Sequence, residues 1–169
     1  MYKKINFLYS WMVWVLTFFL PDAPIIMRFR GWLYSFGMAS CGKNFQVSSN
    51  VRILGLLCLD CGDSVYLASG VIINARAMIK IEDEVLIGIG SLLVSSNHTL
   101  HNGSYRYGKP QALPIYIGKG AWVAGHAIIG GGSIIPNGCL IGANSFVNRR
   151  LEHSGVYAGS PVRFLKTNA

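Results

Sequence analysis

Residues 117–151 read IGKGAW VAGHAI IGGGSI IPNGCL IGANSF VNRRL, and in blocks of six they align without a gap. Each block opens with Ile or Val, and its fifth residue is small or of medium size. A helix repeats about every 3.6 residues and a strand about every two, so neither explains this period. A hexapeptide period is typical of a parallel β-helix, in which the aliphatic residue of each block points inward. The stretch therefore predicts an all-β solenoid.

The same phase can be followed back along the chain to Cys41, which sets the expected solenoid domain at residues 41–166. A two-residue insertion follows Ile73, and the pattern fails from Thr99 to Tyr116. We interpret residues 99–116 as a loop thrown out of the coil, and loops on a rigid scaffold often carry function. The expected inward residues before the loop are Cys41, Val47, Cys61, Leu67, Ile73, Ile81, Ile87 and Leu93.

Residues 1–40 form a different segment, apolar and expected to be helical. The run from Ile5 to Leu20 would span roughly 24 Å as a helix, short of the ~30 Å hydrocarbon core of a bilayer. The next stretch, 27–36, mixes Arg28 and Arg30 with aromatic residues. This pattern favours helices that lie on a membrane surface. The alternative is that they only cap the open end of the solenoid, and the two roles are compatible.

The composition limits the classes of ligand and partner that we expect the protein to bind. The net charge is +8, and the basic residues concentrate near the two ends of the chain. No recognised nucleic-acid motif accompanies this charge, so a phosphate-bearing small molecule or a membrane surface is the better match. The four cysteines follow the repeat or lie in apolar sequence, without zinc-like spacing, and are interpreted as small buried hydrophobic residues. We infer a reducing, cytoplasmic compartment.

His98 is the candidate catalytic residue. It stands in Ser95-Ser-Asn-His98, where the last regular block gives way to the loop. An unperturbed imidazole titrates near pH ~6.5, so at neutral pH it can accept a proton from a hydroxyl group. The position therefore predicts a general base.

With the hexads, the junction at His98, the block Ile117–Trp122 and the closing Gly159-Ser-Pro-Val-Arg163, the sequence resembles the hexapeptide-repeat acyltransferases. The nearest groups are the maltose and galactoside O-acetyltransferases and the bacterial surface-polysaccharide O-acetyltransferases. The resemblance covers about residues 41–166. It implies a left-handed parallel β-helix, a homotrimer with sites between subunits, acetyl-CoA as the acetyl donor, and no metal.

The resemblance also implies roles for particular residues. His98 would deprotonate the acceptor hydroxyl, and the basic residues near the end of the chain would suit the phosphates of CoA. Trp122 would line the donor tunnel, although an outward aromatic at a trimer interface is an equal alternative. The expected donor contacts are Trp122, Gly125, Ala143, Asn148, Arg149, Arg163 and Lys166. The expected acceptor contacts are Tyr66, Asn74, Arg76 and His101.

One departure from the family bears on the acceptor. Arg76 stands where the galactoside enzymes carry an acidic residue, which favours a negatively charged acceptor. The apolar N-terminus resembles the surface-polysaccharide group. The predicted function is acetyl transfer from acetyl-CoA to a sugar hydroxyl of a bacterial surface polysaccharide or lipopolysaccharide precursor. We expect the enzyme to lie peripherally on the inner membrane.

Four alternatives stay open with different weight. An amino-sugar N-acetyltransferase and an antibiotic O-acetyltransferase would use the same donor site. A γ-type carbonic anhydrase needs two histidines five residues apart, and no pair among the four here has that spacing. A non-catalytic β-helix subunit would need neither His98 beside a loop nor cations at the closing coil.

Overall fold

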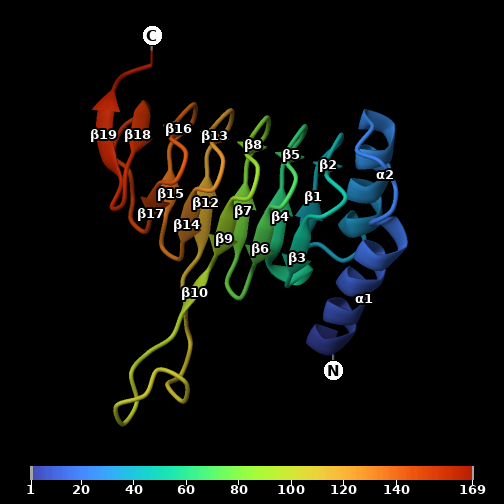
Figure 1. Ribbon diagram of the computed structural model, residues 1–169, viewed down its shortest axis with the longest axis horizontal. Helices are drawn as coiled ribbons and strands as arrows, with labels where there is room; N and C mark the ends of the chain where they lie inside the picture. Colours follow the sequence, from blue (N-terminus) through green and yellow to red (C-terminus); the bar gives the residue numbers. More distant parts are fainter. Residues whose placement is uncertain (1, 169) are drawn as a thin grey trace.

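The computed structural model describes residues 2–168, which form a helical pair followed by a three-sided solenoid (Figure 1). The helices are α1 (Tyr2–Thr17) and α2 (Pro24–Ser35). The chain then visits three parallel sheets in turn, so that each strand pairs with the strand one coil earlier. Ile117, for example, pairs with Ile81 on one side and Ile135 on the other. This architecture confirms the predicted all-β solenoid.

The strands are short, and each sheet runs the length of the solenoid. The first sheet contains β1 (Ser40–Cys41), β4 (Leu59–Cys61), β7 (Ile79–Ile81), β12 (Ile115–Ile117) and β15 (Ile134–Ile135). The second contains β2 (Gln46–Val47), β5 (Tyr66–Leu67), β8 (Leu86–Ile87), β13 (Trp122–Val123), β16 (Leu140–Ile141), β18 (Val156–Ala158) and the antiparallel β19 (Arg163–Lys166). The third contains β3 (Arg52–Leu54), β6 (Ile72–Asn74), β9 (Leu92–Val94), β14 (Ile128–Gly130) and β17 (Phe146–Val147).

The core is the column of inward aliphatic side chains that the hexads predict. The inward residues from Val47 through Val147 are buried, and most have no measurable exposure. The break in phase between Val47 and Cys61 contains one regular inward residue, Ile53, and a two-residue insertion around the short 3₁₀ helix η1 (Leu56–Cys58). The periodic pattern is therefore nearly continuous from the first coil to the last.

All the irregularities of the solenoid fall on one edge of the prism, where the chain passes from the third sheet back to the first. We call residues 55–58, 75–78, 95–114, 131–133 and 148–150 the insertion edge. It carries η1, the insertion after Ile73 and a long hairpin made by β10 (Ser96–Asn97) and β11 (Gln111–Ala112). In Figure 1 the hairpin and the N-terminal half of α1 project from the same side of the solenoid.

The helical pair covers the N-terminal end of the solenoid with a mixed face, on which Val13, Met27 and Tyr34 are buried beside polar residues. Ser10 and Thr17 are buried, and the hydroxyl group of Ser10 donates a hydrogen bond to the carbonyl oxygen of Ile53. Many other apolar residues of the helices point outward, and Phe19 is 86% exposed. Within residues 2–168, no helix has the length and hydropathy that crossing a membrane requires.

Arg30 corrects one expectation, because it does not face outward with Arg28. Its side chain is 1% exposed and pairs with Asp22 at 3.2 Å. The guanidinium group also donates to the carbonyl oxygens of Thr17 (3.2 Å) and Leu20 (3.1 Å), at the end of α1. Burial lowers the pKa of Arg30, and the Asp22 carboxylate opposes that shift. Arg30 therefore locks the two helices together and is not available to lipid head groups.

Candidate active site

The hairpin on the insertion edge has a regular antiparallel root. Ser96 pairs with Ala112 and Asn97 with Gln111 in antiparallel register. The hydroxyl group of Thr99 extends the ladder by donating to the carbonyl oxygen of Lys109 at 2.8 Å. The chain leaves the coil after Ser95 and is back in the first sheet at Ile115, slightly earlier at each end than the expected range 99–116.

One glycine permits this close approach of the two arms. A side chain at Gly108 would place its β-carbon 1.7 Å from the carbonyl oxygen of Thr99. No rotamer can relieve a contact with backbone, so the arms could not meet here without glycine. Beyond this point His101 and Ser104 form an isolated antiparallel bridge at the tip.

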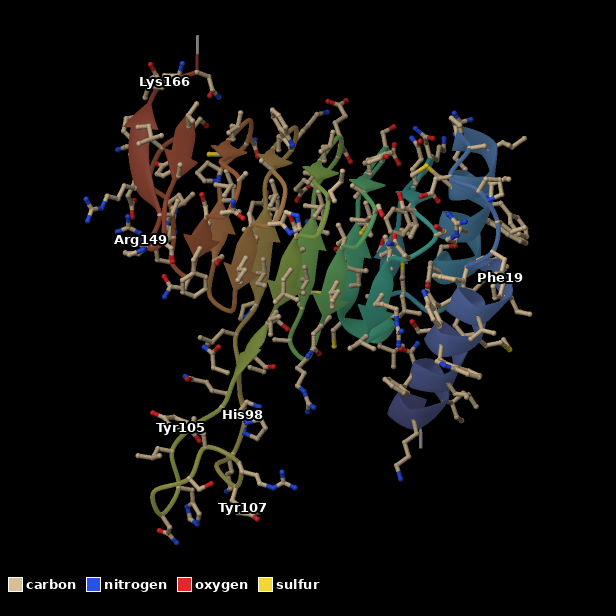
Figure 2. The ribbon with its side chains drawn as sticks, viewed as in Figure 1. Phe19, His98, Tyr105, Tyr107, Arg149 and Lys166 are labelled. Atoms are coloured by element: carbon tan, nitrogen blue, oxygen red, sulfur yellow. The ribbon has the colours of Figure 1, made fainter. Side chains whose placement is uncertain are left out.

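His98 directly follows β10 and is exposed on the hairpin (Figure 2). The register on either side, Asn97 with Gln111 and Thr99 with Lys109, places His98 opposite Pro110. Residues directly opposite in an antiparallel pair have α-carbons about 4.5–5.5 Å apart. The imidazole therefore stands at the base of the excursion, as the sequence predicts, and His101 lies farther toward its tip.

Ser95, which the sequence analysis did not select, fixes the corner that carries Arg76. Its buried hydroxyl oxygen accepts hydrogen bonds from the backbone N–H groups of Arg76 and Ala77, both at 2.9 Å. The same hydroxyl donates to the carbonyl oxygen of Ala77 at 3.0 Å. Ser95 thus joins the root of the hairpin to the corner one coil earlier. No separate signal in the sequence marks this role, because the six-residue period runs on past Ser95 to His98.

A hollow of about 360 Å³ lies beside this corner, between α1, η1 and the returning arm of the hairpin. Arg76 contributes the only formal charge of its lining, and its guanidinium forms no ion pair with any carboxylate in the described part of the chain. The lining residues are Asn6, Gly55, Leu57, Cys58, Ala75, Arg76, Pro110 and Ala112. The structure therefore brings Arg76 next to the hairpin that bears His98, and Asn74 ends the strand just before it.

The expected donor contacts divide over other parts of the prism. Gly125 and Ala143 lie on the edge between the second and third sheets, which we call the glycine-rich edge (residues 88–90, 124–126 and 142–144). They occupy successive coils there, because the N–H group of Asn144 donates to the carbonyl oxygen of Gly125 at 3.1 Å. Trp122 points outward from the second sheet, and so does Tyr66, which was expected among the acceptor contacts. None of these four shares an edge with His98.

The cationic candidates gather at the C-terminal end of the solenoid. Arg163 and Lys166 lie exposed on β19, whereas Asn148 and Arg149 lie on the insertion edge. Arg149 donates to the carbonyl oxygen of Val162 at 2.9 Å, which ties it to the closing segment. Figure 2 shows Arg149 and Lys166 well away from His98. One chain therefore presents the predicted residues as separate groups and does not by itself assemble a complete site.

Burial favours the neutral thiol at Cys41, Cys61 and Cys139. Burial, with smaller effects from Asp60 and Asp63, raises the pKa of Cys41 to about 11. Burial also raises the pKa of Cys61 and of Cys139. Thiols of this kind are poor nucleophiles near neutral pH. Among residues 2–168, no three His, Cys, Asp or Glu side chains gather closely enough to hold a metal ion.

Comparison with known sequences finds relatives that are named as acetyltransferases. The chain is 29% identical over 122 residues to a galactoside O-acetyltransferase of Escherichia coli K12, covering 72% of this chain and 56% of that protein. It is 26% identical over 156 residues to a protein of the same strain named for lipopolysaccharide biosynthesis O-acetyl transfer (WbbJ), covering 83% and 78%. A third relative from the same strain is named for colanic acid biosynthesis acetyl transfer (WcaF). It is 27% identical over 146 residues, covering 86% of this chain and 79% of that protein. No family model matches the sequence.

Comparison with solved structures establishes the fold. A galactoside acetyltransferase in complex with coenzyme A superposes with a TM-score of 0.86 at 24% identity, covering 98% of this chain and 82% of that one. A maltose O-acetyltransferase from Clostridium difficile 630 gives 0.85 at 23%, covering 98% and 87%. A hexapeptide-repeat acetyltransferase from Vibrio cholerae with acetyl coenzyme A gives 0.83 at 21%, covering 97% and 87%. The predicted resemblance and the left-handed β-helix are thus confirmed.

Proposed function

We propose that the protein is an acetyl-CoA-dependent O-acetyltransferase that acts on a sugar hydroxyl of a bacterial surface polysaccharide or lipopolysaccharide precursor. The observation that carries the proposal is the position of His98, on a hairpin beside a hollow in which Arg76 is the only formal charge among the described lining residues. The names of the curated relatives, which describe galactoside, lipopolysaccharide and colanic acid acetyl transfer, support the same reaction. The chain spans 56% of the length of the galactoside relative, so the proposed activity rests on the residues of this chain.

His98 supplies the acid–base chemistry of the transfer. Its neutral imidazole takes the proton of the acceptor hydroxyl while the oxygen attacks the thioester carbonyl of acetyl-CoA. The tetrahedral intermediate then expels the CoA sulfur, which takes the proton back from the imidazolium. The products are the acetyl ester and CoA with a free thiol, so His98 ends in its starting state. A positioned base of this kind contributes roughly 10²–10⁴ to the rate.

The donor fits the cationic end of the solenoid. Arg163 and Lys166 are exposed, and neither forms an ion pair in the part of the chain described. Guanidinium and ammonium groups bind phosphate oxygens through charge-assisted hydrogen bonds. The glycine-rich edge offers backbone that an extended pantetheine arm can approach closely. We infer that Gly125, Ala143 and Trp122 line the arm.

A homotrimer would complete the site, because the predicted residues of one chain lie on different edges. The outward residues of the second and third sheets form apolar ladders, whereas the first sheet presents Asp60, Lys80 and Tyr116. Contiguous apolar surface of this kind marks an interface between subunits. The ladders consist of Tyr66, Leu86, Trp122 and Leu140 on the second sheet and Ile72, Leu92, Ile128 and Phe146 on the third. The His98 edge of one copy would face the donor edge of the next.

The helical pair suggests a peripheral position on the cytoplasmic face of the inner membrane. Its outer surface is apolar and aromatic, and Arg28 is exposed beside it to meet anionic head groups. A helix with this distribution lies in the membrane interface. The exposed residues include Ile5, Phe7, Leu8, Trp11, Met12, Leu16, Phe19, Ile25, Phe29, Trp32 and Phe36. The α1–α2 apolar face, as we call this set, would hold the enzyme where lipid-linked glycan precursors are built.

The direct test of the function is the chemistry of the product. Cells with the gene intact, deleted, or encoding His98→Ala should be compared by mass spectrometry of their surface glycan. We expect O-acetyl groups, removable by mild alkali, only where His98 is present. Identical acetylation in all three strains would contradict the proposed function.

A further inference from the structure

Two hollows adjoin each other beside α1. The inner one contains Arg76 and reaches the hairpin at Pro110 and Ala112. The outer one has a volume of about 380 Å³ and is lined by Ile5, Asn6, Tyr9, Phe36, Gly37 and Leu57. They share Asn6 and Leu57 in their linings, so the two hollows lie side by side between the helical pair and the hairpin, and we call the pair the groove. Each hollow is of the size typical of small-molecule sites, roughly 300–1,000 Å³.

The chemistry of the groove changes along its length. The outer hollow is apolar, and Ile5, Phe36 and Leu57 all expose large hydrophobic surface there. The inner hollow carries the exposed guanidinium of Arg76, which has no carboxylate partner in the described residues. An apolar channel that ends at a free cation is complementary to an apolar chain that ends in an anion.

The inner end of the groove reaches the arm of the hairpin that pairs with the arm bearing His98. Pro110 lines the inner hollow, and the hairpin register places His98 directly opposite it. Ser95 holds the Arg76 corner against the root of the same hairpin through its two hydrogen bonds of 2.9 Å. When an anionic group binds Arg76, a sugar attached to that group would therefore lie close to the imidazole of His98.

We propose that the acceptor sugar is presented on a lipid phosphate, with its apolar chain in the outer hollow, its phosphate on Arg76 and its hydroxyl at His98. This inference rests on the proposed function and narrows the acceptor from any anionic sugar precursor to a lipid-linked one. The outer hollow includes Ile5 and Phe36, which also belong to the α1–α2 apolar face, so the chain can enter the groove directly from a bilayer. A nucleotide-linked sugar has no apolar chain to fill that hollow.

The test is a calorimetric titration of the intact protein with geranyl phosphate, geraniol and inorganic phosphate. We expect geranyl phosphate to bind at least tenfold more tightly than either of the other two, because it alone fills both hollows. Arg76→Gln should weaken geranyl phosphate binding about tenfold or more and leave geraniol unchanged. Lys43→Gln, which removes an exposed charge elsewhere, should have no effect.

A second pair of variants tests the apolar end. Leu57→Asp places a carboxylate in the shared wall of the two hollows and should abolish geranyl phosphate binding. Ile25→Asp changes an exposed apolar residue outside the groove and should not. If Leu57→Asp fails to fold by circular dichroism, the three-ligand comparison on the parent protein and the Arg76→Gln titration still decide the question.

Titration with acetyl-CoA in the same series separates this proposal from the proposed function. Acetyl-CoA binding together with geranyl phosphate binding no tighter than geraniol would overturn the lipid-phosphate acceptor and leave the O-acetyltransferase standing. Inorganic phosphate as tight as geranyl phosphate would also overturn it, by showing a site for a free anion. No binding of acetyl-CoA to the parent protein would instead contradict the proposed function.

Discussion

At the scale of single residues, His98 owes its role to where the chain leaves the coil. The strands beneath it are fixed by a buried aliphatic column, so the first residues of the hairpin are positioned by a rigid base. Ser95 adds a second constraint by binding the preceding corner. A general base needs this kind of support, because a small misplacement of the reacting groups costs a large factor in rate.

His98→Ala should therefore lower kcat for acetyl transfer by roughly 10²–10⁴. Acetyl-CoA affinity should stay within about twofold in a calorimetric titration, because the imidazole acts on the acceptor. His101→Ala is the comparison variant, since it removes an exposed imidazole from the same hairpin. As an expected acceptor contact, His101 should affect KM for the acceptor, whereas kcat should stay near the parent value. Full activity in His98→Ala with loss in His101→Ala would show that the wrong histidine was chosen.

Cys41 predicts a pH dependence of stability. Its pKa is about 11 in the folded protein against an ordinary value of 9.0, so folding disfavours the thiolate. A raised acid pKa gives stability that is complete below the unfolded value and is lost as pH rises through the folded one. Tm should fall between pH ~9 and ~11, and less steeply in Cys41→Ala. Equal slopes for the two proteins in that window would remove Cys41 as a cause.

At the scale of elements, the hexads predicted most of the solenoid because each block reports its own environment. Ile117, Val123 and Ile129 point inward wherever the coil continues, so a local period suffices to place them. The same rule ends the last regular block at His98, which lies in the first arm of the hairpin, just after β10. Neither inference needs knowledge of distant parts of the chain.

What the sequence could not reveal depends on contacts between elements. The apolar run of α1 does not say which side packs on the solenoid, and the structure buries its polar residues Ser10 and Thr17. Arg30 looked available to lipid, but its partners Asp22, Thr17 and Leu20 come from another element. The groove likewise joins residues from α1, η1 and the hairpin. The six-residue period carries no information about such contacts between elements.

The α1–α2 apolar face makes a prediction for membrane binding. Sedimentation with phosphatidylglycerol-containing vesicles should carry the intact protein down, and high salt should weaken the effect by screening Arg28. The double variant Trp11→Asp, Phe19→Asp should stay in the supernatant, because both residues are exposed on that face. Leu165→Asp, at the far end of the solenoid, should still sediment. Sedimentation of all three proteins to the same degree would leave the helices as end caps only.

At the scale of the whole molecule, a complete active site needs a second copy of the chain. The insertion edge carries His98 and Arg76, whereas the glycine-rich edge carries Gly125 and Ala143. Closed symmetry lets one surface of a subunit meet a different surface of the next, so three copies can complete three sites. Light scattering in mild detergent should accordingly give about three chains per particle.

Mixing two inactive variants is the direct test of whether acetyl transfer takes place at a site shared between two copies of the chain. His98→Ala removes the base, and Ala143→Trp obstructs the donor edge at an exposed position. Each alone should be inactive in transferring labelled acetyl groups from acetyl-CoA to lipid-linked glycan. After the two are unfolded together and refolded in equal amounts, about a quarter of the parent activity should return, since random assembly gives some sites both intact edges. A mixture as inactive as its components would contradict the account.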